Sequence, residues 1–96
     1  MQARFDAEVW HWRGPAPYHF VSLPPAEAAE VRDLAAEVTY GWGMIPARAR
    51  IGATMWTTAM YAKDGTYALP VKDAVRRAEG IDLGDVVTVH LDVPGT

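Results

Sequence analysis

The amino-terminal part of the chain alternates between apolar and polar residues. Over residues 4–12, this alternation places three apolar side chains on one face and two carboxylates on the other: Phe5, Ala7 and Val9 against Asp6 and Glu8. A period of two residues predicts a strand with one buried face. Residues 13–17 contain Gly14, Pro15 and Pro17 and predict a turn. Because residues 18–23 have a second strand pattern, the two segments are expected to form a hairpin.

Four later segments also have the pattern of strands: residues 47–51, 54–61, 66–69 and 86–93. In the first of them, Arg48 and Arg50 fall on the face opposite Ala47, Ala49 and Ile51. Asp64 and Gly65 separate two of these segments, and this dipeptide is a strong signal for a tight hairpin turn.

Two segments have helical patterns. Residues 26–37 follow two prolines and consist largely of strong helix formers, with apolar residues at helical spacing at Ala28, Val31, Ala35 and Val38. Residues 71–79 predict a shorter helix that ends at Gly80, with a buried stripe of Val71, Ala74, Val75 and Ala78. About six strands and two short helices predict a mainly β fold. A small closed or half-closed barrel is expected, because so many short strands must protect their open edges.

Composition narrows the class of protein. A chain of 96 residues, half of them apolar, is expected to form a single domain over residues 1–96. The absence of cysteine excludes a disulfide framework and a thiolate metal site. No apolar run is long enough to span a membrane and the first 20 residues do not resemble a signal peptide, so we expect a cytoplasmic protein. The net charge of −3 disfavours a nucleic-acid partner.

The residue types of common catalytic and metal sites are present without their usual spacing. His11, His19 and His90 show no close ligand spacing, and Ser22 lacks a Gly-x-Ser-x-Gly motif. The sequence therefore favours a protein that is not an enzyme, and it predicts no catalytic residue, no metal ligand and no cofactor.

Basic residues and tryptophans provide the candidates for binding. Arg48 and Arg50 share a strand face, whereas Lys72 and Arg76 are spaced to share a helix face next to Arg77. If these faces are contiguous they form a patch for phosphates or carboxylates; otherwise they are solvated surface interleaved with acidic residues.

The tryptophans are the second group of candidates. Trp42 lies between two glycines, which is a poor arrangement for filling a core and favours a contact surface for a ligand. Trp56 lies in the middle of a predicted strand and is expected to behave as a core residue, although it is also a candidate for the same ligand site.

Several ordered motifs resemble one known family. They are Gly41-Trp42-Gly43-Met44-Ile45-Pro46, Ile51-Gly52-Ala53-Thr54-Met55-Trp56, the run from Tyr67 to Ile81, and Gly84-Asp85-Val86-Val87. Together they resemble the bacterial domain of unknown function 1905 family, over residues 4–93. The resemblance implies a double-split β-barrel similar to the fold of the AbrB and MazE transcriptional regulators. It implies no established activity.

Three functional hypotheses follow. The first is a non-enzymatic β-barrel module that binds a small molecule or peptide near Trp42, Trp56, Arg48 and Arg50. The alternative is an AbrB-like nucleic-acid-binding or regulatory domain that acts as a homodimer. The third is a subunit or interaction domain that binds no ligand. A continuous basic stripe would favour the second hypothesis, and a cavity walled by indoles would favour the first.

Overall fold

The computed structural model describes residues 1–11, 18–38 and 44–94, and for residues 36–38 it describes the backbone. These residues form seven strands in one antiparallel sheet, in the order β1-β7-β4-β5-β6-β3-β2. The strands are β1 (Gln2–Glu8), β2 (Trp10–His11), β3 (His19–Ser22), β4 (Ile45–Ile51), β5 (Thr54–Lys63), β6 (Thr66–Val71) and β7 (Val86–Asp92). The helices are α1 (Pro25–Val38) and α2 (Asp73–Glu79). The predicted mainly β fold with two helices is confirmed.

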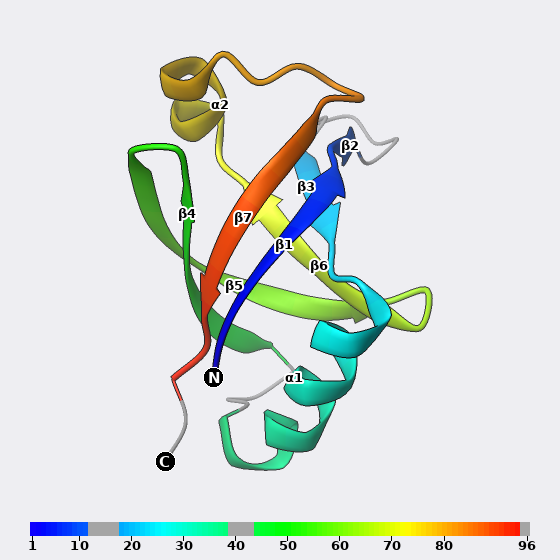
Figure 1. The fold of residues 1–96 in the computed structure, drawn as a ribbon. Coiled ribbons are helices and arrows are strands. Elements are labelled where there is room, and N and C mark those ends of the chain that lie inside the picture. The colour runs from blue at the N-terminus through cyan, green and yellow to red at the C-terminus, as the bar shows by residue number, and fades with distance from the viewer. Residues whose placement is uncertain (12–17, 39–43, 95–96) are drawn as a thin grey trace.

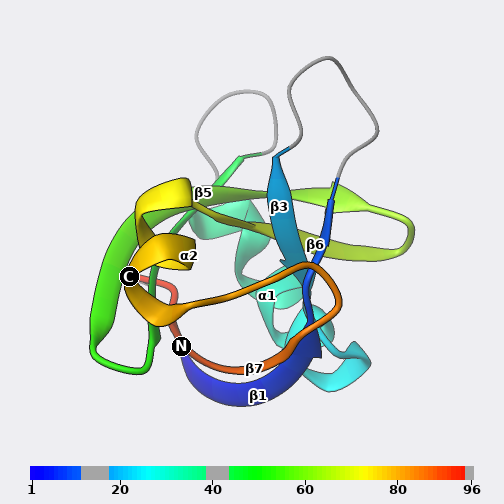
Figure 2. The ribbon, with the colours of Figure 1, turned by 90° about the horizontal axis from the view of Figure 1, so that it is seen from above.

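The two edge strands of the sheet, β1 and β2, are neighbours in the sequence and are separated only by Val9. The sheet therefore curls into a half-barrel, whose rounded outline is visible in Figure 2. Val9 is 1% exposed. Its N–H donates to the carbonyl of Asp85 at 2.8 Å, and its own carbonyl accepts from the N–H of Gly84 at 2.9 Å. These two bonds hold the link between the edge strands against the turn that precedes β7.

The hairpin expected between residues 4–12 and 18–23 is correct only for β2, which pairs with β3. The longer part of the segment, β1, pairs along its whole length with β7 at the other end of the chain. The split at Val9 also explains why the structure has seven strands where the sequence predicts about six. A local alternation pattern does not show which strand pairs with β1, because pairing with β3 and pairing with β7 both satisfy it.

The core lies inside the curled sheet and is filled from every layer of the fold. Its most completely buried large side chains are Val9, Val21, Val31, Ile45, Met60, Leu69, Val89 and Val93. Figure 1 shows α1 below the sheet and α2 above it, so that the helices cover opposite ends of the half-barrel. The face of α1 predicted to be buried is confirmed at Ala28 and Val31.

The short helix α2 differs from its prediction at its start and on its buried face. Val71 belongs to β6, where it pairs with His19, and Lys72 is the N-cap. Of the predicted stripe within α2 only Val75 is buried, while Ala74 and Ala78 are exposed. Because a helix of seven residues has fewer than two full turns, a single anchoring side chain is enough to orient it. The predicted end is confirmed, since Gly80 has a φ of 63° and caps the helix with its N–H on the carbonyl of Arg76.

Two tight turns connect the strands in the middle of the chain. Asp64 and Gly65 both have positive φ, 52° and 80°, and join β5 to β6 as the sequence predicts. Gly52, with a φ of 58°, lies between β4 and β5 against the carboxylate of Glu79. Thr54 Oγ1 donates to Glu79 Oε2 at 2.6 Å, so this hydrogen bond ties α2 to the β4–β5 turn.

Candidate functional site

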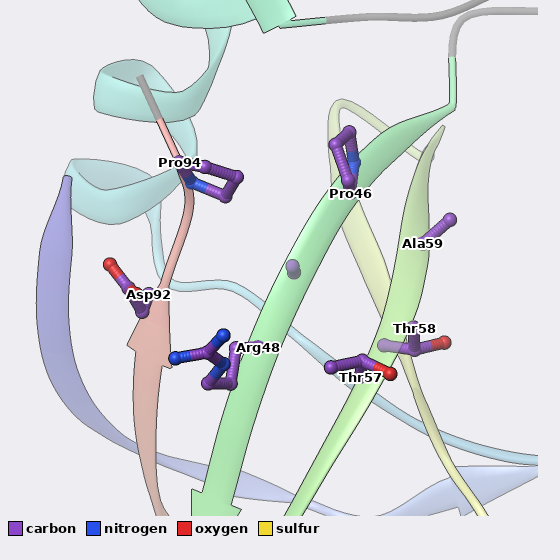
Figure 3. Close-up of a pocket in the computed structure, with 8 residues that line it drawn as sticks. Pro46, Arg48, Thr57, Thr58, Ala59, Asp92 and Pro94 are labelled. Carbon is purple, nitrogen blue, oxygen red and sulfur yellow. The ribbon is translucent and has the colours of Figure 1, made fainter. Parts of the chain in front are cut away.

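A groove opens on the outer face of the sheet where β7 separates from β4. The two strands pair only over Arg48–Arg50, although β4 continues to pair with β5 back to Ile45. After Asp92 the chain stays beside β1 and does not return to β4. The N–H of Val93 donates to the carbonyl of Met1 at 2.8 Å. The groove has a volume of about 450 Å³ and is lined by Pro46, Ala47, Arg48, Thr57, Thr58, Ala59, Asp92 and Pro94 (Figure 3).

Arg48 is the only cation among the residues that line this groove. In Figure 3 its guanidinium reaches from β4 toward β7, and the carboxylate of Asp92 points away from it. Asp92 is its register partner, yet no ion pair forms between them, and within the described residues the guanidinium makes no hydrogen bond. A guanidinium has five N–H donors in a rigid fork, so Arg48 keeps its full capacity to bind a carboxylate or phosphate oxygen.

The rest of the groove combines apolar walls with a hydroxyl group. Pro46 lies on β4 and Pro94 follows the end of β7, while Ala59 extends the apolar wall on β5. Thr57, the register partner of Arg48 on β5, supplies a hydroxyl group that both donates and accepts hydrogen bonds. Such a lining suits a ligand with a short apolar body and one anionic group.

Trp56 does not belong to this groove. It is directly opposite Ala49 on β4 and faces the core, whereas Arg48 and Arg50 face outward. Its side chain is 7% exposed, and Nε1 donates to the carbonyl of Pro70 at 2.9 Å. Successive residues of a strand point to opposite faces, so the structure does not bring Trp56 together with the two arginines. The other predicted indole, Trp42, lies outside the described residues.

Arg50 lies on the same face as Arg48 but is directed along the strand. Its Nη1 donates to the carbonyl of Gly52 at 2.7 Å. Directly opposite Arg50 on β7 is His90, and Arg4 lies opposite His90 on β1. Partial desolvation on the sheet surface, followed by the positive charges of Arg50 and Arg4, lowers the pKa of His90 below its ordinary value of 6.5.

The predicted basic patch is divided between two places. Lys72 lines one groove together with Tyr18, whereas Arg76 and Arg77 line a shallow hollow next to Asp82. Arg76 also forms an ion pair with Asp73 at 3.3 Å. None of the three lines the groove that contains Arg48, so within the described residues the five basic candidates do not form one continuous stripe.

Lys72 lies in an aromatic groove that the sequence did not predict. It has a volume of about 500 Å³ and is lined by Tyr18, His19, Phe20, Tyr61, Pro70, Val71, Lys72 and Asp73. Phe20 stacks on Trp10 at 4.9 Å between ring centroids and meets Tyr61 edge-on at 5.8 Å. Tyr18 is 65% exposed. The aromatic residues are visible in the sequence, but their meeting depends on β5 and β3 both pairing with β6, which no local pattern shows.

Comparison with known proteins decides the family. A family model described as a domain of unknown function, DUF1905, matches residues 5–91. The chain belongs to the DUF1905 family. Among curated proteins, none matches this chain. Since the description of the family names no activity, the function of this DUF1905 chain has to be argued from its own geometry.

The described residues of this DUF1905 protein contain no group of three or more histidine and carboxylate side chains that could hold a metal ion. His11 and His19 are register partners with ring centroids 6.1 Å apart. Ser22 Oγ accepts a hydrogen bond from Trp10 Nε1 at 2.9 Å, so its nearest polar partner is an indole and not a base. No helix among the described residues is long and apolar enough to cross a membrane.

Proposed function

We propose that this DUF1905 protein is a non-enzymatic binding module that takes a small molecule or peptide bearing a carboxylate in the Arg48 groove. The observation that carries the proposal is the free guanidinium of Arg48 in a groove of about 450 Å³. A carboxylate there would receive two parallel N–H···O bonds, the strongest arrangement open to an arginine. The apolar walls at Pro46 and Pro94 would then contact the body of the ligand.

The test compares peptides that differ only in the anionic group. A pool of short peptides with free carboxyl termini is titrated into isotope-labelled protein, and the same pool with amidated termini serves as the control. We expect the free acids to shift the backbone amide signals of Thr57, Thr58 and Ala59, and the amides to shift them much less.

Arg48→Gln should remove this difference by weakening binding of the acids about tenfold or more, because a charge-assisted pair is lost. Arg32→Gln is the matched control, since Arg32 is exposed on α1, does not line the groove and loses the same charge. Equal shifts from acids and amides, or equal binding by the Arg48→Gln variant, would refute the carboxylate site.

We also propose that the curled sheet is a double-split barrel of the AbrB and MazE type in a bacterial, cytoplasmic protein. The ordered motifs that resemble the family support the fold and the bacterial source. A nucleic-acid-binding homodimer is the second candidate. It ranks lower because the net charge is −3 and the basic candidates lie in separate places.

We therefore expect binding to mixed-sequence duplex DNA no tighter than about 10⁻⁴ to 10⁻⁶ M at physiological salt, the range of non-specific contacts. Electrophoretic mobility shifts at several salt concentrations measure it. Tight, steeply salt-dependent binding that disappears in an Arg48→Ala/Arg50→Ala variant would reverse the ranking.

A further inference from the structure

Three basic side chains form a straight row across the outer face of the sheet. Arg4 on β1 is the register partner of His90 on β7, and His90 is the register partner of Arg50 on β4. Residues directly opposite one another in antiparallel strands project from the same face, with Cβ atoms about 4.5–5.5 Å apart. The fold therefore holds three cationic or potentially cationic groups side by side, although their positions in the sequence are far apart.

No acidic side chain of the described residues compensates this row by an ion pair. The two ion pairs in that part of the chain are Lys63–Asp64 and Arg76–Asp73. The carboxylates nearest to the row along the strands have other surroundings. Asp6 accepts from Thr88 Oγ1 at 2.6 Å, and Asp92 lies opposite Arg48 and Gln2.

Glu79 is the remaining carboxylate to consider, because it lies against Gly52, whose carbonyl accepts from Arg50. Glu79 itself accepts from Thr54 Oγ1 and forms no ion pair with Arg50. Like charges opposite one another on a sheet are destabilising. Desolvation on the sheet surface, followed by the charges of Arg50 and Arg4, lowers the pKa of His90. Because no ion pair offsets the two guanidinium groups of the row, a bound anion would be stabilised there.

We propose that Arg4, His90 and Arg50 form a binding site for a single oxyanion of the phosphate class. Two guanidinium groups and an imidazole between them offer donors from three strands to one tetrahedral group, which suits phosphate geometry. Arg50 uses one N–H for Gly52 and keeps the others.

A hollow of about 270 Å³ beside the row includes Arg50, His90 and Met55, which is 59% exposed. Arg48 and Asp92, which also line the Arg48 groove, lie at its edge. Met55 thus provides an apolar surface next to the anion, for the remainder of a phosphorylated small molecule. Neither Arg4 nor His90 lines the Arg48 groove, so this second site goes beyond the proposed carboxylate site.

The experiment follows the imidazole signal of His90 by NMR across pH, with inorganic phosphate as the probe. Sodium chloride at matched ionic strength is the reference, because salt alone screens the two arginines and also raises the pKa of His90. A His90→Gln variant identifies the signal among the three histidines of the chain. We expect the pKa of His90 to be higher in phosphate than in chloride by about half a pH unit or more, because a bound dianion favours the imidazolium.

Arg4→Gln and Arg50→Gln should each weaken phosphate binding by about threefold to tenfold, as expected for one partly exposed charge-assisted contact. Arg32→Gln, a matched loss of charge on α1, should leave it unchanged. All three side chains are on the surface, so these variants are expected to fold, which circular dichroism checks.

Two results would overturn the proposal. One is an equal pKa of His90 in phosphate and in chloride. The other is a shift of the His90 signal with micromolar duplex DNA but none with 20 mM inorganic phosphate. The row would then recognise a nucleic-acid backbone and not a small oxyanion. Failure of the carboxylate proposal would leave the phosphate response intact, since that response is followed at His90 and depends on Arg4 and Arg50, none of which lines the Arg48 groove.

Discussion

Replacement of Trp56 by alanine is expected to be among the most destabilising changes of this protein. The indole is 7% exposed and belongs to the core cluster inside the sheet. Truncation of a buried aromatic residue to alanine typically costs about 3–5 kcal/mol. The change also leaves the carbonyl of Pro70 without the hydrogen bond that it accepts from Nε1 at 2.9 Å, which adds about 1 kcal/mol.

A domain of this length has a total stability of about 5–14 kcal/mol, so Trp56→Ala should remove a large fraction of it. At about 4–8 °C per kcal/mol, the melting temperature should fall by about 12 °C or more. Calorimetry and urea unfolding followed by far-ultraviolet circular dichroism measure this without relying on the fluorescence of the residue that is removed.

Trp56→Phe separates packing from hydrogen bonding. Phenylalanine keeps most of the buried ring but has no N–H, so we expect a smaller loss of about 1–3 kcal/mol. A loss below about 1 kcal/mol for Trp56→Ala would show that the indole is not a core side chain and would refute the reasoning. It would also restore Trp56 as a candidate for direct contact with a ligand.

Three further predictions concern single positions. Trp42→Ala should cost less than about 1 kcal/mol and lower the melting temperature much less than Trp56→Ala. It should also abolish any fluorescence change caused by a ligand. Equal destabilisation by both variants would show that Trp42 is a core residue. Gly80→Ala should cost about 1–2 kcal/mol from positive φ alone. In urea unfolding Gly52→Ala should cost about 1 kcal/mol more, because its Cβ would displace the carboxylate of Glu79 and break the hydrogen bond from Thr54. The pKa of His90 in the folded protein lies below its ordinary value of 6.5, which applies to the unfolded chain. Between these two values the unfolded chain binds more protons at His90, so the free energy of unfolding should fall as the pH drops from above 6.5 through the lower pKa. His90→Gln should reduce this dependence when urea midpoints at pH 7.5 and 5.5 are compared; an unchanged dependence would contradict the assignment.

The alternation of residues was sufficient to predict the faces of individual strands. Arg48 and Arg50 are on the outside of β4 while Ala47, Ala49 and Ile51 are buried, as a period of two requires. The β5–β6 hairpin followed from Asp64 and Gly65, since an L-residue and a glycine with positive φ form this turn through their local chemistry alone.

The partners of the strands could not be predicted in the same way. The pattern predicted a hairpin between residues 4–12 and the next strand, but β1 pairs with β7. Alternation shows that Phe5 is buried, and it does not show which strand lies beside it. The same limitation applies to the candidate sites. The row of Arg4, His90 and Arg50 joins three strands from the beginning, the middle and the end of the chain, so only the topology reveals it.

The pairing of β1 with β7 has a consequence for how the chain reaches its native state during synthesis. The strand made first has no partner until the strand made last has left the ribosome, since all its register partners lie between Val86 and Asp92. At about 5–20 residues per second, that interval is roughly 4 to 17 s. During this interval the apolar face of β1 that contains Phe5 remains uncovered. The contacts between β1 and β7 then require closure of a loop that includes most of these 96 residues. The amino-terminal strand is therefore the segment on which a chaperone would have the longest time to act.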